Sequence, residues 1–107
     1  MRIRKYEVEH AMILTILSAL AERTRLQAIQ ILGDGEEHCV CELMERLEVS
    51  QSRMSRHMKV LKEAGLVIGR RDAQWVRYRS NPALAPEYRA VVQAVLAVEH
   101  ADEMQFA

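Results

Sequence analysis

Cys39 and Cys41 are the residues of this 107-residue sequence whose type and spacing best suit chemistry. Thiolates bind soft, thiophilic ions in preference to oxygen ligands, and oxidants attack the same sulfur atoms. A stabilising disulfide is not expected, because the loop between the two cysteines is short and thiols stay reduced in the cytosol. Chemistry, either as ligands of a soft ion or as sites of oxidation, is therefore expected of the pair.

The spacing of the two cysteines restricts the backbone that can carry them. On an ideal α-helix, residues two apart are separated by about 200° of rotation, so the two sulfurs would face opposite sides. Both thiolates can hold one ion only where the backbone is non-helical or distorts. Because a short helix is predicted over residues 40–47, binding would deform the entrance to that helix, which supports the helix after it.

The charge of the chain is concentrated in one segment. Residues 50–81 hold eight Lys or Arg against two acidic residues, a net charge of +6, whereas the flanking segments 1–49 and 82–107 carry −3 each. A basic block of this kind favours contact with a polyanion such as nucleic acid. The alternative is a solvated basic face without a partner.

Hydrophobic periodicity predicts one domain, residues 1–107, that is mainly α-helical with a small β-hairpin, in the order α-α-α-α-β-β-α. Ser50 is expected to cap the fourth helix and Gly65 to end it. The expected helices cover 5–20, the segment that follows Ala21 and is stopped by Gly33-Asp34-Gly35, 40–47, 51–64 and a last segment that begins near Pro86. The expected strands are LVIGRR and QWVRYRS, joined near Asp72-Ala73.

Two helices joined by a short turn and followed by a basic hairpin describe a winged helix-turn-helix, with the helix-turn-helix at 38–64 and the wing at 66–80. The fourth helix is predicted to enter the major groove of DNA, where Gln and Arg can contact base edges and Ser and Lys can reach phosphates. His57 falls on the inward edge of this helix and is interpreted as a core or hydrogen-bonded histidine. The predicted DNA-binding residues are Gln51, Ser52, Arg53, Ser55, Arg56 and Lys59 on the helix and Arg70, Arg71 and Arg77, together with Arg79, on the hairpin.

Other classes of protein fit the sequence poorly. No apolar stretch is long enough to span a membrane, and the charged N-terminus is unlike a secretory signal, so a cytoplasmic protein is expected. An enzyme is not expected, because C-x-C is not the usual redox pair and no nucleophile with a base and no phosphate-binding glycine loop is evident. No organic cofactor is predicted.

The run EEHCVCEL, followed by SQSRMSRHMKVLKEAGLV and RRDAQWVRYRSNP, resembles the ArsR/SmtB family of metalloregulatory repressors, in particular its arsenic-responsive type. The resemblance covers about residues 12–100. It implies a homodimeric repressor that leaves double-stranded operator DNA when As(III) or Sb(III) binds, with Cys39 and Cys41 as the sensor thiols. It also implies that segments 1–20 and 86–107 form the dimer interface.

Two positions depart from the family pattern. Sensors of this type often carry a third cysteine three positions after the second, where this sequence has Met44. The third ligand is then His38, solvent, an exogenous thiol or none, and Met44 is expected in the core. The family also uses a zinc-type site on the last helix; His100 and Glu103 match its second half, but Arg89 cannot ligate metal, so His100, Asp102 and Glu103 are interpreted as a polar helix end.

Two alternatives keep the DNA-binding fold but change the signal. In the first, the two cysteines sense oxidants or reactive sulfur by being oxidised instead of coordinating a metalloid. In the second, the chain is a constitutive architectural DNA-binding protein that responds to no inducer and has a weak sequence preference.

Overall fold

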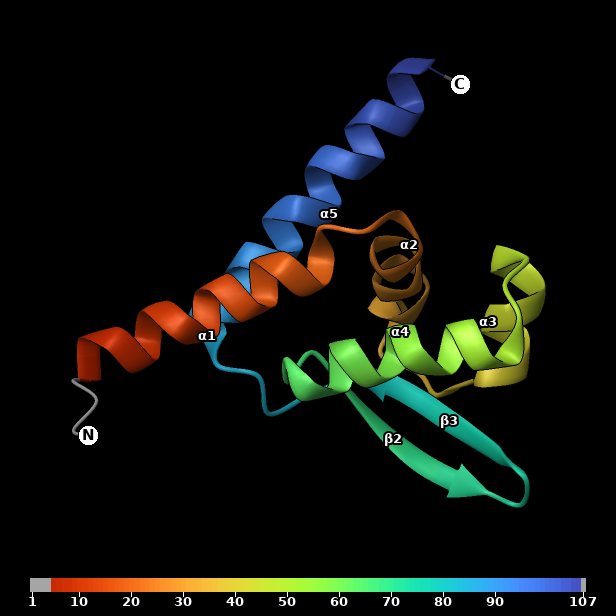
Figure 1. The fold of residues 1–107 in the computed structure, drawn as a ribbon. Coiled ribbons are helices and arrows are strands. Elements are labelled where there is room, and N and C mark those ends of the chain that lie inside the picture. Colours follow the sequence, from red (N-terminus) through yellow and green to blue (C-terminus); the bar gives the residue numbers. More distant parts are fainter. Residues whose placement is uncertain (1–4, 107) are drawn as a thin grey trace.

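A computed structural model describes the backbone of residues 5–106 and the side chains of residues 12–101 (Figure 1). Residues 1–4 and 107 of the predicted dimerisation segments therefore lie outside the described residues. The side chains of Asp102 and Glu103 also lie outside them. The elements in chain order are α1 Lys5–Leu20, α2 Arg23–Ile31, the 3-10 turn η1 Leu32–Asp34, β1 His38–Cys39, α3 Val40–Leu47, α4 Gln51–Glu63, β2 Val67–Asp72, β3 Trp75–Ser80 and α5 Pro86–Phe106.

The sheet has three antiparallel strands in the order β1-β3-β2, one more than the predicted hairpin. Strands β2 and β3 form the hairpin, whose turn includes Ala73 with a left-handed φ of 57°. Strand β1 is only two residues long and pairs with the other side of β3, with His38 opposite Tyr78 and Cys39 opposite Arg77. So short a strand has no periodicity of its own, which is why the sequence pattern did not predict it.

The core lies where α4 packs against α2, α3 and the sheet. Met54, Met58 and Leu61 lie three or four residues apart on α4 and are fully buried, as their helical spacing predicts. They pack in one cluster with residues of the other elements, among them Ile16, Leu32 and Leu43. The core thereby fixes which side of α4 faces solvent.

The two long terminal helices, α1 and α5, carry apolar side chains that the rest of the described chain does not cover. In Figure 1, α1 and α5 lie on the side of the molecule away from the β2–β3 hairpin, and the C-terminal half of α5 projects away from the rest of the chain. Large apolar side chains are exposed on both helices, namely Met12, Leu14 and Leu17 on α1 and Val98 on α5. Within the part of the chain that the structure describes, no helix is long and apolar enough to cross a membrane.

Candidate nucleic-acid interface and thiol pair

Helix α4 begins at a capped turn and displays its polar side chains to solvent. Ser50 is in an extended conformation, and its hydroxyl accepts a hydrogen bond from the backbone N–H of Arg53 (3.4 Å). At the other end, Gly65 takes a left-handed φ of 79°, as predicted for the residue that ends this helix. All six side chains predicted to contact DNA from this helix are exposed: Gln51, Ser52, Arg53, Ser55, Arg56 and Lys59.

The turn between α3 and α4 is short because α3 ends in a left-handed residue. Glu48 has φ 55°, and the backbone N–H of Val49 donates to the carbonyl oxygen of Met44 (3.1 Å). The chain then passes directly to Ser50 and α4. Helices α3 and α4 pack on each other, so a change in the position of α3 bears on α4.

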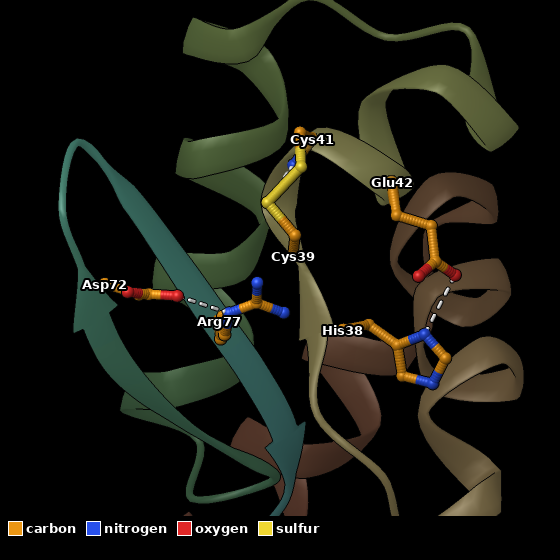
Figure 2. Close-up of a disulfide and its surroundings, with 6 residues drawn as sticks. All are labelled: His38, Cys39, Cys41, Glu42, Asp72 and Arg77. Carbon is orange, nitrogen blue, oxygen red and sulfur yellow. Dashed lines mark hydrogen bonds and ion pairs between the residues drawn. A yellow bond between two sulfur atoms is a disulfide. The ribbon is translucent and has the colours of Figure 1, made fainter.

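The basic side chains of the wing, β2 and β3, are partly neutralised by acids of the same chain. The guanidinium of Arg70 donates two hydrogen bonds to the carboxylate of Glu37 (2.9 and 2.8 Å), and Arg77 donates to Asp72 (2.7 Å; Figure 2). These hydrogen bonds lower the pKa of both Glu37 and Asp72. Arg71 is exposed, whereas the buried Nε of Arg79 has no hydrogen-bond partner among the described residues. The predicted wing residues therefore differ in how free they are to contact a ligand.

Cys39 and Cys41 are joined by a disulfide at the entrance to α3 (Figure 2), so the expectation of two separate thiols was wrong. The reason is the backbone of Cys39, which is extended (φ −64°, ψ 143°) and precedes the helix instead of belonging to it. The two Cα atoms are 5.1 Å apart, and the backbone N–H of Cys41 donates to the Sγ of Cys39 (3.2 Å). The opposed orientation expected on an ideal helix does not arise, because only Cys41 is helical.

His38 lies next to the thiol pair, but both of its ring nitrogens are engaged by carboxylates. Nδ1 contacts Glu42 and Nε2 contacts Asp34, each at 2.8 Å. Partial burial alone would lower the pKa of His38; the hydrogen bonds to Glu42 and Asp34 outweigh it and raise that pKa. Both ring nitrogens already contact carboxylates, so neither is free to bind a metalloid, and the arrangement disfavours His38 as the third ligand.

Three residues stand at ligand positions of the family pattern but are not expected to bind metal: Met44, Arg89 and His100. Met44 is half-buried and packs against the hydrophobic core, as expected. Arg89 donates to the carbonyl oxygens of Pro82 and Leu84 (2.9 and 3.2 Å), and His100 is exposed. Among the described residues, no group of three or more His, Cys, Asp or Glu side chains is arranged to hold a metal ion.

Sequence reasoning gave no role to Arg25, which contacts α4 from the first turn of α2. One of its Nη atoms lies 3.3 Å from Nδ1 of His57, and His57 is in turn 3.7 Å from the carboxylate of Glu22. His57 is thus half-buried and polar-bonded, as predicted. The sequence carries no local signal for these contacts, because Arg25 and His57 are 32 residues apart.

Comparison with known proteins identifies the fold and family. The sequence model of the arsR family of bacterial regulatory proteins matches residues 22–68. The arsenic resistance transcriptional regulator ArsR1 of Pseudomonas putida is 38% identical over 81 residues, which are 76% of this chain but 63% of that protein, less than two thirds of its length. The transcriptional activator HlyU of Vibrio cholerae is 41% identical over 93 residues, 87% of this chain and 82% of that protein.

Solved structures agree with the sequence matches. Two structures of HlyU from Vibrio cholerae, one of them of the reduced protein, have TM-scores of 0.72 at 34% identity and cover 90% of this chain and 97% of theirs. The homodimeric winged helix-turn-helix DNA-binding domain Mb0332 of Mycobacterium bovis has a TM-score of 0.75 at 24% identity and covers 97% of this chain and 91% of that one. The fold is therefore a winged helix-turn-helix, as predicted. The chain belongs to the arsR family of bacterial regulatory proteins, and its family and fold are those of DNA-binding transcriptional regulators, not of enzymes.

Proposed function

We propose that the chain is a cytoplasmic, homodimeric repressor. It dissociates from its operator when As(III) or Sb(III) binds the thiolates of Cys39 and Cys41. The observation that carries the proposal is the juxtaposition of the two sulfur atoms at the start of α3, one from the N-cap residue Cys39 and one from Cys41 in the first turn. Soft metalloid ions select sulfur over oxygen ligands. The similarity to arsenic resistance regulators such as that of Pseudomonas putida supports the same assignment.

The donor set fits such an ion when the disulfide is reduced. Cys39 is buried and Cys41 is half-buried, and their Cα atoms are 5.1 Å apart, close enough for both thiolates to contact one ion. Met44 occupies the place where related sensors carry a third cysteine, and both nitrogens of His38 are engaged. The third position is therefore assigned to solvent or to an exogenous thiol.

The position of the thiol pair connects it to both proposed DNA-contacting elements. Cys39 lies in β1, which pairs with wing strand β3, and Cys41 lies in the first turn of α3, which packs on α4. When the pair binds its inducer, the change in the sulfur positions moves the backbone between β1 and α3. Helix α4 and the wing then lose the relative placement that fits the operator.

A dimer is proposed because one helix in the major groove reads few base pairs, whereas two related by a two-fold axis read half-sites one turn of DNA apart, about 34 Å. Exposed apolar side chains on α1 and α5 (Met12, Leu14, Leu17, Val98) supply the surface that a second copy would cover. The homodimeric state of the Mycobacterium bovis domain, which has the same fold, is consistent with this arrangement.

The test is operator binding with and without candidate inducers. A high-affinity duplex is first selected from a random pool, and binding is then followed by fluorescence anisotropy in the presence of As(III), Sb(III), Zn(II) and Cd(II). We expect release by As(III) and Sb(III) under reducing conditions, and we expect the variant Cys39→Ser/Cys41→Ser to bind DNA but to ignore both ions. Normal release from that variant would refute the proposed sensor.

A thiol-based redox or reactive-sulfur sensor is the second candidate, and the disulfide between Cys39 and Cys41 favours it. The similarity to HlyU, which has been solved in a reduced form, is consistent with this interpretation. Titration with peroxide or a persulfide donor separates the two functions, because a redox sensor leaves the operator on oxidation without any metalloid. Indifference to every inducer would instead indicate a constitutive DNA-binding protein.

A further inference from the structure

A basic hollow of about 260 Å³ lies beside α4, outside the thiol site. Three arginines, one histidine and one valine line it: Arg25 from α2 and Arg53, Arg56, His57 and Val60 from α4. The lining carries three guanidinium groups and no carboxylate among the described residues, and the nearby carboxylate of Glu22 contacts His57 at 3.7 Å. The hollow therefore has an excess of positive charge and suits an anion.

The guanidinium of Arg25, which forms one wall of the hollow, has a partner at each of its three nitrogens. Its Nε donates to the carbonyl oxygen of Ala19 (2.6 Å), one Nη donates to that of Ser18 (3.3 Å), and the other lies 3.3 Å from His57. The guanidinium thus joins the end of α1 and the start of α2 to the middle of α4. A fixed donor of this kind is already oriented before a ligand arrives, which reduces the entropic cost of binding.

The opposite wall is formed by two exposed arginines of α4. Arg53 and Arg56 are exposed, and neither forms an ion pair with a described residue. Together with Val60, they follow one side of α4 at spacings of three and four residues. Gln51, Ser55 and Lys59 follow a different stripe at spacings of four, so the helix presents two separate polar surfaces.

We propose that this hollow holds one backbone phosphate of the operator, with Arg53 and Arg56 contacting the phosphate and Arg25 fixing the wall beside them. The proposal rests on the proposed operator binding, and it assigns phosphate contact and groove reading to different residues of α4. Guanidinium forks match phosphate oxygens well, and phosphate contacts set the register of a protein on DNA, whereas base contacts specify the sequence. The stripe of Gln51, Ser55 and Lys59 is left to read the groove.

The first test is the salt dependence of DNA binding by Arg53→Gln/Arg56→Gln. We expect affinity for the selected operator and for an unrelated duplex to fall by the same factor, so that their ratio is unchanged. The slope of log K against log salt should fall by about 0.9 for each phosphate that the variant no longer neutralises, hence by about 1.8 in a dimer. Arg46→Gln, which removes one positive charge per chain from the exposed surface of α3 where the double variant removes two, should leave the slope unchanged.

The second test uses operators in which single phosphates are replaced by uncharged methylphosphonates. Wild-type protein should lose affinity at one particular phosphate in each half-site, and Arg53→Gln/Arg56→Gln should be insensitive to substitution at that same phosphate. An unchanged salt slope, a loss confined to operator selectivity, or equal sensitivity of both proteins to every methylphosphonate would overturn the assignment. Failure of wild-type protein to bind any selected duplex would instead count against the proposed function itself.

Discussion

Cys39 and Arg77 lie directly opposite each other where β1 pairs with β3. Opposed residues of an antiparallel pair project from the same face of a sheet, so the thiol pair and a wing guanidinium share one face (Figure 2). The next strand continues the row, because Arg77 is itself opposite Arg70 on β2. A single line across the sheet therefore joins the proposed sensor to two proposed DNA contacts.

This register predicts that inducer binding at the thiols also changes the backbone hydrogen bonding of the wing. When As(III) is added to the reduced protein, amide hydrogen exchange should change both at residues 38–41 and at residues 76–79, because the two segments share ladder hydrogen bonds. The measurement is exchange followed by mass spectrometry. Cys39→Ser/Cys41→Ser should show neither change, and a change confined to residues 38–47 would show that the sheet does not transmit the signal.

The ion pair between Glu37 and Arg70 predicts a variant that binds DNA more tightly. Glu37→Gln removes the carboxylate that holds the exposed Arg70 guanidinium, and freeing that group for phosphate should raise operator affinity by about two- to threefold, since exposed pairs are weak. Anisotropy titrations at fixed salt measure the effect. The control is Glu36→Gln, which removes a neighbouring exposed charge that has no ion pair among the described residues; equal gains in both variants would point to a general charge effect.

The contacts of His38 predict that its contribution to the free energy of unfolding depends on pH. Its pKa is raised by Glu42 and Asp34 above the value of about 6.5 expected in the unfolded chain. The stabilisation is therefore fully present below about pH 6.5 and is lost as pH rises through the higher folded pKa. In a Cys39→Ser/Cys41→Ser background, which removes thiol titration, the thermal stability lost on His38→Gln should be larger at pH 5.5 than at pH 8.5. A loss independent of pH would contradict this.

The sequence predicted the parts of the site that depend on local pattern. Ser50 and Gly65 bracket α4 closely, and the spacing of Met54, Met58 and Leu61 determined which of its residues are exposed. The thiol geometry could not be obtained in this way, because the extended backbone of Cys39 depends on pairing with a strand almost forty residues later.

The ion pairs of the wing and the contacts that line the basic hollow could not be predicted from the sequence, for one shared reason. Arg70 and Glu37 are 33 residues apart, and Arg25 and His57 are 32 apart. Neither pair has a periodic or capping signal, since each forms only after the tertiary fold has brought two elements together. The sequence could therefore predict which residues of α4 are available to DNA, but not which arginines already have partners.

The place of Met44 predicts how the sensor can be strengthened. Residues three apart on a helix are neighbours, so Met44→Cys would set a third sulfur beside Cys41 on α3. Because this thiolate is supplied within the chain at high effective concentration, the As(III) concentration for half-maximal operator release should fall about tenfold. Anisotropy measures that midpoint, with Arg46→Cys as the control that adds a thiol elsewhere on the same helix. Two results would contradict an inducer site at Cys39 and Cys41 that a sulfur at position 44 can reach. In one, Met44→Cys leaves the As(III) concentration for half-maximal release unchanged; in the other, Arg46→Cys lowers it equally.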